Sequence, residues 1–262
     1  MNGKVNFNQL DKKLRVYETL NDTYVLPGIY MVARIDGRNF TRLTKEVHKF
    51  DAPYDKRFRD LMVSTVEHLM NCGFRVVFGY TQSDEISLLF HINENGFGRK
   101  LRKLSSVLAG EASAKFSVLL GDMGAFDCRI SQLPNLDLVV DYFRLRSEDA
   151  HRNALNGHCY WALRKQNKSA KLATQTLSGL SVAEKNELLF QQGKINFNDL
   201  PAWQRRGVGV YNEYFSIEGK NPISGGISET FRRRNKVHTE LPMKEELAQF
   251  LRAIIIESER ES

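Results

Sequence analysis

Two short acidic motifs contain the residue types in this chain that are best suited to chemistry. The first is Asp36-Gly37-Arg38-Asn39, directly after an apolar run at residues 28–35, and the second is Ser83-Asp84-Glu85, between two further apolar runs. Carboxylate oxygens are ligands that Mg²⁺ prefers, and phosphate groups and water usually complete its coordination. Each motif taken alone is also an ordinary turn sequence. Their chemistry therefore depends on whether the fold brings the two carboxylates together.

The apolar pattern around the motifs predicts alternating strands and helices. Short runs rich in strand-forming residues predict buried strands, and apolar residues at helical spacing between start and stop signals predict helices. The predicted elements are, in order, a strand at 28–35, a helix at 53–72, strands at 74–80 and 86–92, a helix at 99–115 and a strand at 126–130. This order, β-α-β-β-α-β, is typical of a ferredoxin-like α+β domain.

In the β-α-β-β-α-β order the first and third strands are neighbours at the centre of an antiparallel sheet. Asp36, at the end of the first strand, should therefore face Asp84, in the turn before the third. Both helices cover one face of such a sheet, so we expect the other face to be free for a ligand. Facing carboxylates favour a site for phosphoryl transfer with two magnesium ions roughly 3.5–4 Å apart, and the Gly37 carbonyl is a candidate further ligand. Two purely structural turns are the alternative.

The second half of the sequence predicts a mostly helical C-terminal extension. Helices are expected at 136–163 and 182–190, a polar loop at 193–201 and a strand at 206–215. No repeat, low-complexity tract or linker marks a second independent domain. Residues 1–262 are therefore expected to form a single domain.

Composition and charge are those of a globular protein that attracts polyanions. Of the 262 residues, 42% are hydrophobic and 26% are charged, which excludes general disorder. Lys and Arg outnumber Asp and Glu by 38 to 31, and the net charge of +7 favours nucleic acid or nucleotides as partners. Three cysteines without paired spacing argue against a disulfide framework. With no long apolar run and no secretory signal, we expect a cytoplasmic protein without membrane contact.

Three motifs resemble those of the tRNA-histidine guanylyltransferase family, especially its bacterial and archaeal guanylyltransferase-like branch. They are Arg34-Ile35-Asp36-Gly37-Arg38-Asn39-Phe40, Tyr80-Thr81-Gln82-Ser83-Asp84-Glu85 and Lys185-Asn186-Glu187-Leu188-Leu189-Phe190. The likeness extends from about Leu14 to Tyr214. Members resemble the palm of polymerases but add nucleotides in the 3′-to-5′ direction at the 5′ end of tRNA.

The resemblance implies a reaction, cofactors and partners. It implies a nucleotidyltransferase with a polymerase-like palm at residues 23–135 and a helical extension at 136–262, which would contact tRNA and the other subunits of a homotetramer. ATP or GTP would activate a 5′-monophosphate end of the tRNA. The 3′ hydroxyl of the incoming nucleotide would then attack that end, with two Mg²⁺ ions as cofactors.

Residue by residue, the family's motifs imply roles for positions of this chain. Asp36 and Asp84 would be the metal-ion carboxylates, with the Gly37 carbonyl as a third ligand, and Glu85 matches a second acidic catalytic position. The positions that match nucleotide-binding segments are Asp36, Gly37, Arg38, Asn39, Phe40, Thr41, Ser83, Asp84, Lys185 and Asn186. The lysine would contact triphosphate, although a solvent-facing lysine on a helix is the alternative for Lys185.

Two departures from the family pattern concern the substrate. The eukaryotic motif His-Ile-Asn-Asn-Leu-Tyr-Asn corresponds to residues 151–157, which keep only its His, Asn and Leu, and a lysine expected before Pro53 is replaced by Ala52. Both departures favour template-dependent repair of 5′-truncated tRNA. The alternatives are a tRNA-histidine guanylyltransferase proper and a nucleotidyl cyclase on the same palm, while an RNA-binding module of this topology would need no metal.

Basic runs are the candidates for tRNA contacts. The runs that fit phosphate contacts are 99–103, 205–206 and the group Arg232, Arg233, Arg234 and Lys236, and a solvated surface is the alternative for each. His151 is a further candidate from the motif match. Four aromatic residues lie in helical patterns and are expected to pack in the core instead of stacking on bases: Tyr142, Phe143, Tyr160 and Trp161.

Overall fold

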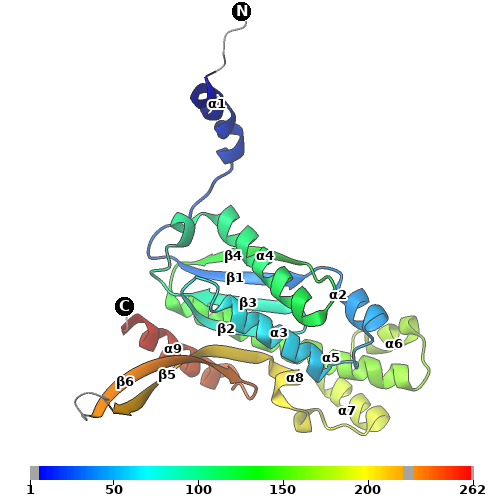
Figure 1. The fold of residues 1–262 in the computed structure, drawn as a ribbon. Helices are drawn as coiled ribbons and strands as arrows, with labels where there is room; N and C mark the ends of the chain where they lie inside the picture. The colour runs from blue at the N-terminus through cyan, green and yellow to red at the C-terminus, as the bar shows by residue number, and fades with distance from the viewer. Residues whose placement is uncertain (1–5, 221–226, 261–262) are drawn as a thin grey trace, which may run out of the picture.

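The computed structural model describes residues 6–220 and 227–260 (Figure 1). The elements up to the middle of the chain are α1 (Phe7–Thr19), β1 (Tyr30–Gly37), α2 (Phe40–Arg42), the π-helix η1 (Leu43–Val47), α3 (Lys56–Leu69), β2 (Val76–Gln82), β3 (Glu85–Phe90), the 3-10 helix η2 (Gly96–Arg99), α4 (Leu101–Leu120) and β4 (Phe126–Leu133). The later elements are α5 (Leu136–Lys165), α6 (Ala170–Leu177), α7 (Val182–Gly193), the 3-10 helix η3 (Phe197–Asp199), α8 (Ala202–Arg206), β5 (Val208–Lys220), β6 (Ile227–His238) and α9 (Lys244–Arg260).

The strands form one six-stranded sheet in the order β4-β1-β3-β2-β5-β6, and every pair is antiparallel. The predicted β-α-β-β-α-β order is confirmed. Its four strands are β1 to β4, and β1 and β3 lie side by side at the centre of these four. In their register Asp36 lies opposite Glu85, and Ile35 lies opposite Ile86. The pairing places the ends of the two predicted motifs at the same edge of the sheet.

One face of the sheet packs against α3 and α4, as predicted. Val66 and Leu69 of α3 and Leu104 and Phe116 of α4 are fully buried in this layer. Helix α3 begins later than the expected residue 53, because the Asp55 side chain accepts a 2.7 Å hydrogen bond from the Arg57 backbone amide and caps the helix there.

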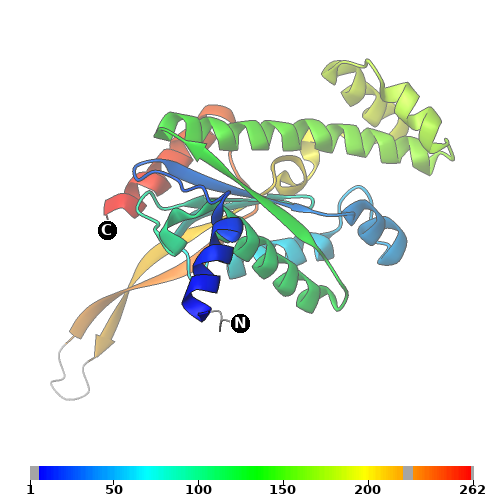
Figure 2. The same ribbon diagram turned by 90° about the horizontal axis from the view of Figure 1, so that it is seen from above.

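The second face of the sheet is covered, so the expectation that it is free for a ligand is wrong. Figure 2 shows α5 and α9 on the side opposite α3 and α4. Their apolar residues pack against Val32, Val77, Phe78 and Leu89, which point to this face. The near-continuous apolar runs of β2 and β3 are typical of strands buried on both sides. A ligand must therefore bind at an edge of the sheet.

The C-terminal extension contains the predicted helices α5 and α7 and also completes the sheet. The expected strand at 206–215 is β5, whereas β6 and α9 were not predicted. Strand β5 pairs with β2, so that Phe78 lies opposite Tyr211, and β6 then pairs with β5. The palm and its extension thus share one sheet. None of the described helices has the length and hydropathy needed to cross a membrane.

The basic run at 99–103 has a structural role. Arg99 is only 5% exposed, and its guanidinium donates hydrogen bonds to the carbonyls of Ile92 at 3.0 Å and Glu94 at 3.1 Å, and also to the carbonyl of Ile29. Lys100 and Arg102 both form ion pairs with Asp22. The expectation that the whole run contacts RNA phosphate is therefore wrong for Arg99, which holds the segment before β1 to the segment after β3.

We expect Arg99→Met to lower the free energy of unfolding by about 1–3 kcal/mol, because three backbone carbonyls lose their donor in a buried place. Denaturant titrations followed by circular dichroism measure the change. Lys103→Met, at an exposed position of the same run, is the matched control and should leave stability nearly unchanged. Equal stability of the two variants would contradict this assignment.

Candidate active site

The turn between β2 and β3 presents Asp84 at the edge of the sheet. Gln82 and Glu85 are paired, so the turn has only Ser83 and Asp84 at its tip, and it is shorter than the predicted 81–85. Ser83 has a φ of +54° and its hydroxyl donates a 3.0 Å hydrogen bond to the Asp84 carboxylate. The Asp84 carbonyl accepts a 3.0 Å hydrogen bond from the Gly37 amide. This bond joins the turn directly to the end of β1.

Glycine is required beside Asp36 because the backbone there is in close contact with its surroundings. A Cβ atom at Gly37 would lie 2.6 Å from the ring of Phe40 and 2.9 Å from the Cβ atom of Asp84, closer than real contacts allow. Phe40 is in turn held by ring contacts with Phe116 and Phe126, at centroid distances of 5.0 and 4.8 Å. The Asp-Gly motif therefore fits Asp36 closely against the Asp84 turn.

Asp36 and Asp84 place two negative charges near each other at this edge of the sheet. Burial raises the pKa of Asp84 above its ordinary 3.8, and the charges of Asp36 and Glu85 raise it further, against the lowering effect of its hydrogen bonds. Within residues 6–220 and 227–260 no ion pair involves Asp36 or Asp84. A bound cation would relieve this repulsion.

The donor set fits Mg²⁺ and leaves coordination positions for a substrate. Two carboxylates and the nearby Gly37 carbonyl are hard oxygen donors, which this ion prefers. Among the described residues no group of three or more His, Cys, Asp or Glu side chains is placed to hold a metal. A closed protein cage is thus missing there, and Mg²⁺ at Asp36 and Asp84 would be completed by phosphate oxygens and water, as is usual for this ion.

Glu85 is engaged by two arginines, which the sequence reasoning did not identify. Its carboxylate forms an ion pair with Arg34 and a second one with Arg146 of α5 at 3.5 Å, and Arg146 is held in turn by Asp149 at 2.8 Å. The structure places Glu85 as the counter-ion of two guanidiniums, and Arg34 and Arg146 both line the same cavity as the aspartates. Strand alternation is a signal for Arg34, since it lies on the same face of β1 as Asp36.

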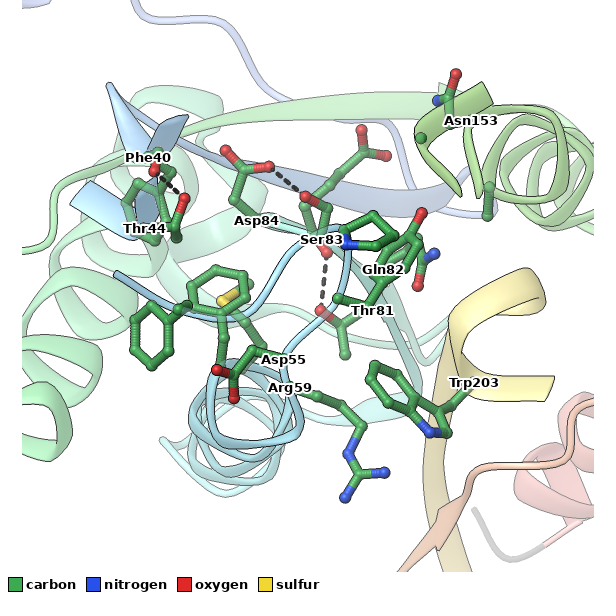
Figure 3. A pocket seen from close by; sticks show the side chains of 18 of the residues that line it. Phe40, Thr44, Asp55, Arg59, Thr81, Gln82, Ser83, Asp84, Asn153 and Trp203 are labelled. Carbon is green, nitrogen blue, oxygen red and sulfur yellow. Dashed lines mark hydrogen bonds between the residues drawn. The ribbon is translucent and has the colours of Figure 1, made fainter. Parts of the chain in front are cut away.

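A cavity of about 500 Å³ opens beside the acidic edge. It is enclosed by the end of β1, the segment 40–59, the β2–β3 turn, α5 and α8, and Figure 3 shows Asp84, Ser83, Asn153 and Trp203 around it. Six of the predicted site residues line it: Asp36, Phe40, Thr41, Ser83, Asp84 and Glu85. Gly37, Arg38 and Asn39 were also predicted site residues, but they connect Asp36 to Phe40 without lining the cavity themselves. Arg38 and Asn39 are exposed. The cavity is large enough for a nucleotide.

Aromatic side chains form part of the wall of the cavity. Trp203 has the Arg59 guanidinium over its ring at 4.7 Å, and Trp161 has the Lys45 ammonium at 5.3 Å. Burial raises the pKa of Tyr54, in the same wall, to about 12. The expectation of core packing is confirmed for Phe143 but is wrong for Trp161. Such a wall suits stacking on nucleobases.

The structure does not bring Lys185, Asn186 or His151 into this cavity. Lys185 and Asn186 lie on α7, where the Asn186 side chain donates a 2.9 Å hydrogen bond to the Val182 carbonyl. His151 packs edge-on against Phe197 with ring centroids 5.0 Å apart, and burial lowers the pKa of its imidazole. The part of the 151–157 motif that reaches the cavity is instead Asn153 and Gly157, which lie one helical turn apart.

The predicted tRNA-binding run on β6 is divided between two faces of its strand. Alternation places Arg232, Arg234 and Lys236 on one face and Arg233 on the other. Arg234 donates two hydrogen bonds to Glu213, at 2.8 and 2.6 Å, and Lys236 also pairs with Glu213. The four cationic side chains are all exposed, and the Glu213 carboxylate of β5 partly neutralises one of the two faces.

The chain matches two family models that together span most of its length. Residues 11–134 match the family model described as tRNAHis guanylyltransferase, and residues 137–255 match the model described as Thg1 C terminal domain. A probable tRNA(His) guanylyltransferase of Mus musculus is 33% identical over 193 residues, which are 70% of this chain and 64% of the mouse protein. A Drosophila melanogaster relative with the same description is 32% identical and covers 71% of this chain and 68% of its own.

A solved structure shows the same architecture. A bacterial tRNA(His) guanylyltransferase (Thg1)-like protein in complex with GTP has a TM-score of 0.70 and 25% identity, and the match covers 94% of this chain and 99% of that chain. The chain spans just under two thirds of the length of the mouse relative.

We expect Asp84→Asn to stabilise the folded protein near neutral pH, because the ionised carboxylate is less favourable in the folded than in the unfolded chain. The free energy of unfolding of the variant should exceed that of the natural chain at pH 7. The difference should shrink as the pH falls through the raised pKa of Asp84 and vanish below the ordinary value of 3.8, where both states are protonated.

Urea titrations at several pH values test this prediction, with Asp141→Asn at an exposed position of α5 as the control. Added Mg²⁺ should raise the stability of the natural chain and not that of Asp84→Asn. A variant that is less stable than the natural chain at pH 7 would show that the carboxylate is already compensated by the protein.

Proposed function

Because this chain belongs to the tRNA(His) guanylyltransferase family, we propose that it transfers nucleotides to the 5′ end of tRNA. The observation that carries the proposal is the pair of carboxylates, Asp36 and Asp84, held together by the hydrogen bond from Gly37 at the rim of a nucleotide-sized cavity. Nucleotidyl transfer needs such a pair beside space for two phosphorylated substrates.

The residues of the cavity fit the charge distribution of the reaction. Two Mg²⁺ ions held by Asp36, Asp84 and the Gly37 carbonyl would supply electrostatic stabilisation for the attacking and the leaving oxygen. Arg34 and Arg146 line the cavity and would bind the negatively charged triphosphate, since guanidinium groups pair well with phosphate oxygens. Glu85 then pairs with both arginines and orients them while no nucleotide is bound, and Asp149 is the second partner of Arg146.

The reaction proceeds in two substitutions at phosphorus. First, the 5′-monophosphate of the RNA attacks the α-phosphate of ATP or GTP, and pyrophosphate leaves. Second, the 3′ hydroxyl of the incoming nucleotide attacks the activated 5′ phosphate, loses its proton, and displaces AMP or GMP. The aromatic wall that contains Trp161 and Trp203 would stack on the bases during both steps.

We further propose that truncated tRNA is the preferred substrate and that the added nucleotide is chosen by the template strand. The departures at residues 151–157 and at Ala52 support this choice, because at both places the sequence differs from the family pattern described above. The alternative, addition of a guanylate to histidine tRNA, is favoured by the names of the curated relatives. The chain would act in the cytoplasm as a homotetramer, with exposed Arg232 and Arg233 among its contacts to the RNA backbone.

Asp36→Asn should reduce the rate of nucleotide addition by at least about a hundredfold, because it removes a charged ligand from the reacting centre. The measurement uses 5′-truncated tRNA, ATP, labelled GTP and Mg²⁺, and the control variant is Asp141→Asn. A cyclic nucleotide formed without tRNA would point to the cyclase alternative. Normal turnover by Asp36→Asn would refute the assignment of the metal site.

The substrate preference requires a separate experiment. At equal concentrations of the two RNAs, we expect the enzyme to extend 5′-truncated tRNA in preference to intact histidine tRNA, and to add the nucleotide that pairs with the opposite strand. Changing the template base should change the nucleotide added. Preference for intact histidine tRNA, with guanylate added whatever the template, would favour the guanylyltransferase alternative.

A further inference from the structure

Helix α1 lacks the packing that holds the other long helices in place. None of its 13 residues is buried, and Figure 1 shows it projecting away from the sheet and its covering helices at the end of an extended segment. The Asn6 side chain caps it by accepting a 3.1 Å hydrogen bond from the Asn8 amide. A helix of this length is only marginally stable alone in water. Its stability therefore calls for a partner.

An apolar stripe runs the length of α1. The stripe consists of Phe7, Leu10, Leu14 and Tyr17, which are 79%, 41%, 51% and 76% exposed. Their spacings of three, four and three residues follow the heptad pattern by which one helix packs along another. The opposite side of the helix is mostly polar, with Val16 as its exposed apolar residue. The shape of the stripe thus fits a second helix as its occupant.

Charged residues flank the stripe with opposite signs on its two sides. If Phe7 occupies position a and Leu10 position d of a heptad, then Asp11 and Glu18 occupy e positions. Lys13 occupies the g position on the other side of the stripe. Within the described part of the chain, neither Lys13 nor Glu18 has an ion-pair partner. Asp22 and, to a smaller extent, Glu18 raise the pKa of the Arg102 guanidinium. Among the described residues, however, neither Glu18 nor Lys13 is held in a contact ion pair, so both charges are available to a partner.

We propose that α1 pairs in parallel with α1 of a second copy of this chain. In a parallel pair, Lys13 of each copy lies beside Glu18 of the other, which gives two interchain ion pairs next to the apolar seam. An antiparallel pair would instead place Lys13 beside Lys13 and acidic residues beside acidic residues. A membrane surface suits the stripe less, because the polar side of α1 mixes both signs of charge instead of being rich in Lys and Arg.

This pairing is independent of the reaction proposed above, since α1 contributes no residue to the cavity. It also determines the relative placement of two subunits. The rest of each subunit follows the C-terminal end of its α1. In a parallel pair the two subunits therefore lie at the same end of the helix pair.

The test measures the molar mass of the full chain by sedimentation velocity across a range of concentrations. Leu10→Asp/Leu14→Asp should weaken self-association at least about tenfold, because it places charges in the seam. Val16→Asp, on the opposite side of the same helix, is the matched control and should leave the mass distribution unchanged. Circular dichroism shows whether each variant is folded. An unchanged mass distribution for the double variant would overturn the proposal.

Two further measurements separate the alternatives. Under mild oxidation, Leu10→Cys should give a covalent dimer that the natural chain, with its own three cysteines, does not form. A dimer that forms only when Leu10→Cys and Leu14→Cys are combined would show an antiparallel pair and overturn the proposed orientation. If Leu10→Asp/Leu14→Asp instead abolishes binding to vesicles of anionic phospholipid and leaves the mass unchanged, the stripe is a membrane contact and the proposal is wrong.

Discussion

The pairing of β1 with β3 is the constraint on which the site depends. It aligns Asp36 with Glu85, and the hydrogen bond from Gly37 to the Asp84 carbonyl continues the ladder by one step into the turn. A shift of one residue in this register would reverse which side chains of β1 face the cavity. The buried residues Val32, Ala33 and Ile35 prevent such a shift, because they fit opposite layers of the core.

Three carboxylates meet at this edge, and the protein treats them differently. Glu85 is balanced by Arg34 and Arg146, whereas Asp84 carries a raised pKa and has only hydroxyl and backbone partners. The difference follows from the position in the hairpin, since Glu85 belongs to a strand and Asp84 to the turn. A site that keeps part of its charge uncompensated is less stable than the fold permits, and such sites bind cations and phosphates.

The core of the fold could be predicted from the sequence because its elements are short, strongly patterned and separated by turn residues. The closeness of Asp36 and Asp84 followed from the order of these elements, which makes the first and third strands neighbours. The cover over the second face could not be derived in the same way, because the apolar pattern of α5 does not show which face of the sheet it packs against, and α9 reaches that face from the far end of the chain. The contact of Glu85 with Arg146 could not be foreseen either, because the two residues are 61 positions apart in the sequence. Trp161 lies in a helical pattern that gives no sign of whether it faces the core or a cavity.

The pairing of β2 with β5 has a consequence for synthesis of the chain on the ribosome. The segment that ends at β4 is made first, yet it lacks its neighbour strand along Phe78–Thr81 and the helices that cover Val32 and Leu89. At roughly 5–20 residues per second, the rest of the chain takes on the order of ten seconds to follow. During that interval an open strand edge lies beside a bare apolar surface, which is the combination that chaperones bind. The nascent palm thus depends on protection until β5 arrives.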